Sequence, residues 1–272
     1  MQSQRSPYKR LLSICAFCLV LSGASWAEDH AKPDNGYNCV LMGHSFFVPM
    51  ARQLEEHAKR AGFENHQQVV SGAGGGKGSP GELWKNLDRT INSREAIRSG
   101  SVNLVGLTAA SIGSELADYK RWVDFALEHN PKTSFFIMAP SSRYQDKSFE
   151  EFEGAWKNTH ARLHSGIDDL RKAYPETTFF CIPQGQIKVE LWRLFDEGKL
   201  PEVTELKSRD NPSIFRDNTG HGGQVVIKTG TLLWLASIYQ ADLDEYDWDP
   251  QTKTDLKALA QKIAKDDPYT KH

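Results

Sequence analysis

The chain has 272 residues and carries 33 Lys and Arg against 35 Asp and Glu, a formal net charge of −2. A slightly acidic chain has no electrostatic attraction for nucleic acid or for anionic membranes, so neither is an expected partner. Only four cysteines are present, which excludes a disulfide-rich scaffold.

The N-terminus predicts an export signal. Three basic residues among the first ten precede an apolar run over 11–21, and Ser25 and Ala27 then stand where a signal peptidase requires small residues. The apolar run is too short to span a membrane with ease. We therefore expect residues 1–27 to be removed, leaving a secreted or periplasmic protein without a membrane span.

Apolar runs with the length of buried strands alternate along the chain with segments of helical periodicity. The runs cover residues 39–42, 68–70, 102–107, 134–138 and 177–182. This alternation predicts an α/β fold: a flavodoxin-like, doubly wound, five-stranded parallel sheet of order 2-1-3-4-5 with helices on both faces. We expect one domain over residues 28–248 and a C-terminal helical tail over 249–272.

This strand order bears on Cys39 and Cys181, the two cysteines that remain after the signal is removed. They fall on the first and fifth predicted strands, which lie three positions apart, or about 14 Å at ~4.8 Å per strand. A disulfide requires Cα atoms within about 7 Å of each other. We therefore expect two buried free thiols.

The first predicted strand runs directly into Gly43, His44 and Ser45, and Pro49 follows at a position suited to the first turn of a helix. Open α/β sheets bind their ligands at the carboxyl ends of the strands. The free N–H groups at a helix N-terminus favour an oxyanion. Ser45 is therefore a candidate nucleophile, and a simple turn or N-cap role is the alternative.

A glycine-rich loop follows the second predicted strand. A phosphate-binding loop needs a hydroxyl residue directly after its Gly-Lys pair, but Gly78 follows Gly76 and Lys77, so nucleotide binding is not expected. We expect the flexible backbone to bring N–H groups toward Ser45; the alternative is an ordinary surface loop.

The next segment predicts a helix. Ser79 and Glu82 have the spacing of a capping box, with a proline between them. Leu83, Leu87 and Ile91 then recur at helical spacing and predict one apolar helical face.

Two histidines lie one turn apart on a long helix predicted over residues 148–174. His160 and His164 have the spacing of a metal-binding pair, but the sequence shows no third ligand beside them. We therefore interpret them as a solvated face. Ser111 and the polar loop over 141–144 follow the third and fourth strands and are weaker candidates for substrate contacts.

A second informative segment precedes the mostly apolar helix predicted over residues 225–239. His221 stands between Gly220 and Gly222, which give it backbone freedom and space. Asp217 is near enough in sequence to orient the imidazole, whereas Asp210 is a more distant competitor for that role. An ordinary polar turn is the alternative interpretation.

Together, the two segments resemble the SGNH (GDSL-like) hydrolase superfamily. That family places its serine in a G-D-S motif after the first strand, matched here by Gly43, His44 and Ser45. Its base lies in a D-x-x-H motif before the last helix, matched by Asp217 and His221 with one additional residue between them. The motifs occur in the family's order and span most of the chain, while the residues within them match the family pattern only in part.

The remaining motifs of the family concern the oxyanion. The resemblance assigns a glycine N–H after the second strand to Gly72, with 74–76 as alternatives. The family's third motif, G-x-N-D, reads Gly-Leu-Thr-Ala over 106–109, so Thr108 stands where an asparagine is expected. The resemblance therefore implies that the oxyanion is bound by the N–H groups of Ser45 and Gly72, with the Thr108 hydroxyl as a third donor.

The function that this resemblance implies is that of an exported serine esterase. Its triad of Ser45, His221 and Asp217 would cleave a small acyl ester, most simply an acetyl ester on a carbohydrate, with no cofactor and no metal. One alternative is a catalytically weak or inactive SGNH-like protein that binds glycans. Another is a metal-dependent hydrolase that uses His44 and His221. The oligomeric state is left open.

Overall fold

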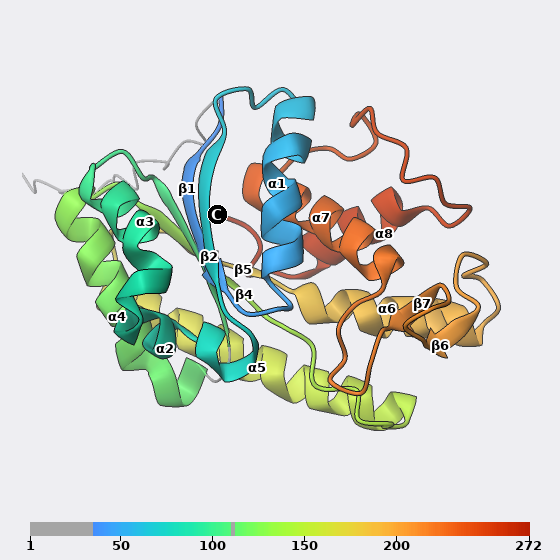
Figure 1. Ribbon diagram of the computed structural model, residues 1–272. Coiled ribbons are helices and arrows are strands. Elements are labelled where there is room, and N and C mark those ends of the chain that lie inside the picture. The colour runs from blue at the N-terminus through green and yellow to red at the C-terminus, as the bar shows by residue number, and fades with distance from the viewer. Residues whose placement is uncertain (1–34, 110–111) are drawn as a thin grey trace, which may run out of the picture.

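The computed structural model describes residues 35–109 and 112–272, so the predicted export segment over 1–27 lies outside the described residues. Five parallel strands form the central sheet in the order β2-β1-β3-β4-β5 (Figure 1). They are β1 (Asn38–Gly43), β2 (Gln67–Gly72), β3 (Leu104–Thr108), β4 (Ser134–Met138) and β5 (Phe179–Ile182). This order confirms the predicted α/β fold.

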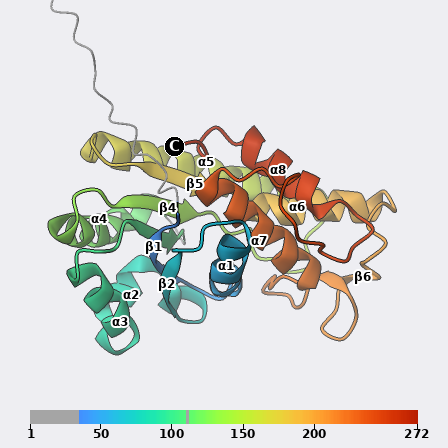
Figure 2. The ribbon, with the colours of Figure 1, turned by 90° about the horizontal axis from the view of Figure 1, so that it is seen from above.

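Helices cover both faces of the sheet. They are α1 (Val48–Arg60), α2 (Pro80–Lys85), α3 (Leu87–Arg98), α4 (Ile112–His129), α5 (Phe149–Ala173), α6 (Gln184–Asp196), α7 (Gln224–Tyr239) and α8 (Leu256–Asp266). Helices α1 and α7 pack together on one face, and α2, α3 and α4 lie on the other (Figures 1 and 2). Helix α5 contacts β5, α4 and α6, and α8 packs against α7. Within the described ranges, no helix has both the length and the hydropathy to cross a bilayer.

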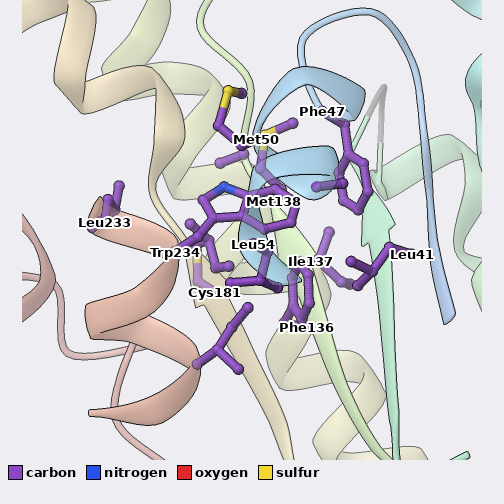
Figure 3. Close-up of a cluster of buried hydrophobic side chains, with 14 of the residues drawn as sticks. Leu41, Phe47, Met50, Leu54, Phe136, Ile137, Met138, Cys181, Leu233 and Trp234 are labelled. Carbon is purple, nitrogen blue, oxygen red and sulfur yellow. The ribbon is translucent and has the colours of Figure 1, made fainter. Parts of the chain in front are cut away.

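An aromatic cluster fixes the turn between β1 and α1. Phe47 is fully buried, stacks on Phe136 at 6.1 Å between ring centroids, and meets Trp234 of α7 edge-on at 4.8 Å (Figure 3). Its ring also presses on Gly43: a Cβ at Gly43 would lie 2.5 Å from Cγ of Phe47. The glycine in this motif is therefore required by close packing.

Helix α5 shows how well a local signal specifies a helix start. The Ser148 side chain accepts a hydrogen bond from the N–H of Glu151, whose carboxylate accepts one from the N–H of Ser148. This reciprocal pair is a capping box. The helix ends at Ala173, within one residue of the predicted boundary.

The predicted capping box at Ser79 is wrong, although a helix does begin after that residue. Ser79 makes no side-chain capping bond. The segment then divides at Asn86, whose non-helical backbone ends α2 and whose side chain caps α3. Leu83 lies before this break and is buried, whereas Leu87 and Ile91 lie after it and are 53% and 38% exposed, so the three do not form the predicted apolar face.

The two thiols are as predicted. Cys39 and Cys181 are both free and fully buried, on β1 and β5. Strands β3 and β4 lie between them, so the sheet separates the sulfur atoms.

We expect Gly43→Ala to lower the free energy of unfolding by about 1–3 kcal/mol, because the added methyl group overpacks the Phe47 ring. Urea unfolding would measure the change. Gly154→Ala is the matched control: a Cβ there meets no atom within 4 Å, and alanine in the middle of α5 should add about 0.5–1 kcal/mol. Equal stability of the Gly43 variant and wild type would contradict the packing argument.

Candidate active site

The two segments singled out in the sequence meet at the carboxyl end of β1. Nε2 of His221 lies 2.8 Å from Oγ of Ser45, and its Nδ1 lies 2.8 Å from Oδ2 of Asp217. Ser45 belongs to the turn between β1 and α1, whereas the other two residues belong to the turn before α7. A serine, an imidazole and a carboxylate are thereby joined by two consecutive hydrogen bonds. Asp210, the competing acid, is exposed and lines a neighbouring pocket.

Local backbone bonds hold the histidine turn in shape. Oδ1 of Asp217 accepts hydrogen bonds from the N–H groups of Gly220 and His221, at 3.0 and 3.2 Å. Gly220 has a φ of +93°, in the left-handed region that favours glycine. Burial raises the pKa of Asp217, but the bonds from His221 and Gly220 outweigh it and lower the pKa, so Asp217 remains a carboxylate.

A small sheet that the sequence did not predict supports this turn. Strands β6 (Glu205–Lys207) and β7 (Ser213–Phe215) pair in parallel, and Phe215 forms an antiparallel bridge with Gly222. The N–H of Arg216 donates to the carbonyl of His221 at 2.8 Å. These backbone contacts close residues 215–222 into a hairpin-like turn, which limits the motion of the imidazole.

A pocket of about 380 Å³ opens beside Ser45 and His221. Part of its wall is apolar, formed by residues of α1 and α7: Pro49, Met50, Val226 and Ile227. Arg209 and Arg216 also line it, and within the described part of the chain neither guanidinium has an ion-pair or hydrogen-bond partner. The pocket thus combines an apolar side with two unneutralised cations.

Lys188 of α6 is a buried cation that the sequence analysis missed. It is 4% exposed; its Nζ donates to Oγ of Ser141 at 3.0 Å and to the carbonyl of Gly220 at 2.6 Å. The same Nζ lies 4.3 Å from the centre of the Phe46 ring, which packs edge-on against His221. Lys188 therefore connects the loop after β4 to the histidine turn. The signal in the sequence was a lysine that stands between two apolar residues, Ile187 and Val189.

Burial lowers the pKa of Lys188 to about 7, although the Asp217 carboxylate acts in the opposite direction. Burial also lowers the pKa of His44 to about 4, and the positive charges of Lys188 and His221 lower it further. His44 is therefore a neutral imidazole at physiological pH.

The hydrogen bonds of His44 define its tautomer. Nδ1 accepts from the N–H of Phe46 at 3.1 Å, so the ring proton is on Nε2, which lies 3.1 Å from Oγ1 of Thr108. The Thr108 hydroxyl accepts from His44 and keeps its own proton for another acceptor. Nε2 of His44 thus faces Thr108, whereas Nε2 of His221 faces Ser45.

The glycine loop approaches the serine turn at a position the sequence analysis did not select. Gly78 is buried, and a Cβ there would lie 2.6 Å from Cα of His44, next to Ser45. The alternatives over 74–76 are exposed, with no atom within 4 Å of a built Cβ.

Gly72, the predicted oxyanion donor, lies on the edge strand β2. The N–H of Ala73 donates to the carbonyl of Gly43 at 3.2 Å, and Arg89 donates to the carbonyl of Gly72 at 3.3 Å. Because successive peptide groups of a strand alternate in direction, the Gly72 N–H faces the free edge of the sheet. Its predicted role in binding an oxyanion stays a prediction.

No family model and no curated protein matches this chain. Among solved structures, a DUF4886 family protein from Bacteroides uniformis superimposes with a TM-score of 0.57 at 14% identity, covering 85% of this chain and 94% of that one. This likeness supports the fold.

Two further solved structures are more distant. The periplasmic domain of a lipopolysaccharide acetyltransferase from Salmonella ser. Paratyphi A gives a TM-score of 0.43 at 9% identity, covering 77% of this chain and 86% of its own. A gut microbial diltiazem-metabolizing enzyme gives 0.40 at 14% identity, covering 78% of this chain and 48% of its own. Both are too distant to carry an argument about this chain.

The low pKa of Lys188 should appear in the pH dependence of stability. Between about pH 7 and its ordinary pKa of 10.5, the unfolded chain binds one more proton than the folded chain, so the free energy of unfolding rises with pH. Lys188→Met should remove this contribution, which is at most about 1.4 kcal/mol per pH unit. Urea unfolding from pH 6.5 to 10 would test it. If the free energy of unfolding had the same pH dependence in the variant and in wild type, burial would not have lowered the pKa of Lys188.

Proposed function

We propose that the protein is a serine esterase of the SGNH type, with Ser45 as nucleophile, His221 as general base and acid, and Asp217 as the residue that orients His221. The observation that carries the proposal is the pair of 2.8 Å contacts that joins the three side chains at the edge of a pocket. The position of Ser45 after β1 and of His221 before α7 is that of the two family motifs.

In the first half of the reaction, Oγ of Ser45 attacks the ester carbonyl carbon while Nε2 of His221 takes the hydroxyl proton. The carbonyl oxygen becomes an oxyanion in a tetrahedral intermediate. When the intermediate collapses, the bond to the alcohol oxygen breaks and His221 returns its proton to that oxygen. The alcohol leaves, and the acyl group remains on Ser45.

In the second half, water takes the place of the alcohol. His221 removes one proton from it, the resulting hydroxide adds to the acyl carbon, and the bond to Oγ breaks as His221 protonates Ser45. In each half the Asp217 carboxylate fixes the ring proton on Nδ1 and stabilises the imidazolium. The cycle releases a carboxylic acid and regenerates the free serine.

Several groups beside Ser45 are suited to bind the oxyanion. The N–H of Ser45 has no backbone acceptor among the described residues. We propose it as one donor and the N–H of the closely packed Gly78, in the loop after β2, as another. The Thr108 hydroxyl, which retains a proton, is the proposed third donor. A preformed set of donors is typically the largest contribution to such catalysis.

The pocket indicates the class of substrate. A volume of about 380 Å³ accommodates a small acyl group and part of a sugar. We propose that the substrate is a short acyl ester, most simply an acetyl ester, on a carbohydrate. The unpaired Arg209 and Arg216 favour an alcohol component that also carries an anionic group, such as a uronic acid or a phosphorylated sugar.

Removing the nucleophile or the base should abolish turnover without unfolding the protein. We expect Ser45→Ala and His221→Ala each to lower kcat for an aryl acetate by about 10⁴–10⁶-fold, and the double variant to lose no more than either single variant, because the two residues act together. The thermal midpoint should change little. A reactive phosphonate should label wild type at Ser45.

A second pair of variants tests the acid of the triad: Asp217→Asn removes the proposed acid, and Asp210→Asn is its matched control. Asp217→Asn should lose about 10⁴-fold in kcat because the imidazole takes the wrong tautomer, while Asp210→Asn should behave as wild type. A folded Ser45→Ala protein with near wild-type turnover would end the serine-esterase proposal. If wild type is neither labelled by the phosphonate nor active on esters but still binds sugars, the glycan-binding alternative is the correct one.

Thr108→Val keeps the shape of the side chain and deletes the hydroxyl. If Thr108 binds the oxyanion, kcat should fall at least about tenfold with KM unchanged, since one lost donor typically costs about 10²–10³-fold. Thr108→Ser retains the hydroxyl and should retain most of the turnover. Equal turnover in the valine variant and wild type would restrict Thr108 to holding His44.

A further inference from the structure

The histidine pair of α5 acquires partners through the fold. His160 and His164 lie one helical turn apart, Cys181 lies on β5, and Asp267 directly follows α8. One ligand atom from each of the four residues lies within 4.8 Å of every other. Two consecutive elements, α5 and β5, and the distant segment after α8 thus place two imidazoles, a thiol and a carboxylate around one point.

Both imidazoles face the same carboxylate. Nε2 of His160 lies 2.7 Å from Oδ2 of Asp267, and Nε2 of His164 lies 3.2 Å from Oδ1. The His164 nitrogen is buried and makes no hydrogen bond, so its direction does not suit an N–H donor. A metal ion between the four groups would use the lone pair of that nitrogen.

A buried carboxylate makes a cation favourable at this point. Asp267 is 5% exposed and Cys181 is fully buried. A buried carboxylate is costly unless opposite charge or hydrogen-bond donors compensate it, and a metal cation supplies such a charge. A bound cation would also hold the Cys181 sulfur as a thiolate.

Neighbouring groups hold the four side chains in place. Trp156 stacks on His160 with 4.6 Å between ring centroids, and Tyr269 stacks on His164 at 3.8 Å. The N–H of Tyr269 donates to Oδ1 of Asp267 at 2.8 Å. Ligands whose orientation is fixed by surrounding contacts bind a metal with less loss of entropy.

The cluster is accessible to an ion. His160 and Asp267 line a surface pocket of about 240 Å³, together with the acidic residues Glu190 and Asp266. None of the four candidate ligands lines the pocket beside Ser45. The cluster is therefore separate from the candidate active site, and this inference does not depend on the proposed esterase activity.

We propose that His160, His164, Cys181 and Asp267 bind one Zn²⁺ ion as a structural site. Two imidazole nitrogens, one thiolate and one carboxylate oxygen are ligands that zinc accepts, and four protein ligands complete a tetrahedral shell with no position left for substrate. The ion joins the C-terminal segment after α8 to α5 and β5. Its role is to stabilise the fold.

The test uses the mature protein, stripped with a chelator and then titrated with Zn²⁺ and with Co²⁺ as a spectroscopic probe. We expect one ion per chain, proton release as Cys181 ionises, and a thermal midpoint about 5–10 °C higher when zinc is at ~100 times its Kd. Bound Co²⁺ should show the intense visible bands of a tetrahedral site and a thiolate-to-cobalt band in the near ultraviolet.

Variants separate this site from adventitious binding. His164→Gln, which removes a buried nitrogen without a hydrogen bond, should weaken zinc binding by at least ~100-fold, and Cys181→Ala should abolish the thiolate-to-cobalt band. Cys39→Ala removes the other buried thiol and should leave affinity and spectrum unchanged. Wild-type affinity in a folded His164→Gln protein, or a cobalt complex without the thiolate band, would overturn the proposal.

Discussion

The packing of Phe47 against the backbone of Gly43 is the contact on which the candidate site depends. It sets the direction in which α1 leaves β1, and so the direction in which Ser45 points. The same ring meets Trp234 of α7, the helix that follows His221. One buried aromatic side chain therefore positions both halves of the site, because helices packed on the same ring cannot shift independently.

Local signals in the sequence specified most of the fold. Each of the five predicted strands falls on an observed strand, with boundaries that agree within two residues. Of Ser45, Asp217 and His221, which the two motifs singled out, the histidine lies within hydrogen-bond distance of the other two, while their catalytic roles stay a prediction. The predicted face over Leu83, Leu87 and Ile91 failed because Asn86 offers its side chain as a cap, which competes with continuing the helix.

The features that the sequence could not predict are contacts between distant segments. Nothing local indicates that Lys188 reaches the carbonyl of Gly220, or that Asp267 lies between two histidines of α5. Both are buried charges, and the fold stabilises them differently. The partners of Lys188 are neutral: a carbonyl, a hydroxyl and an aromatic face. Burial therefore lowers its pKa and makes its neutral form accessible. The aspartate has imidazoles and a backbone N–H, so its charged form is retained.

Ser45 and His221 are separated by 176 positions in the chain. The ribosome therefore makes the proposed nucleophile among the first elements of the domain and its proposed base among the last. Strands β1 to β5 can pair before α7 exists, but Ser45 and His221 cannot come together until that helix docks on α1. A growing chain, or a fragment cut anywhere between the two turns, carries a serine without its base. In the proposed esterase, acyl transfer would therefore require that α7 has docked on α1.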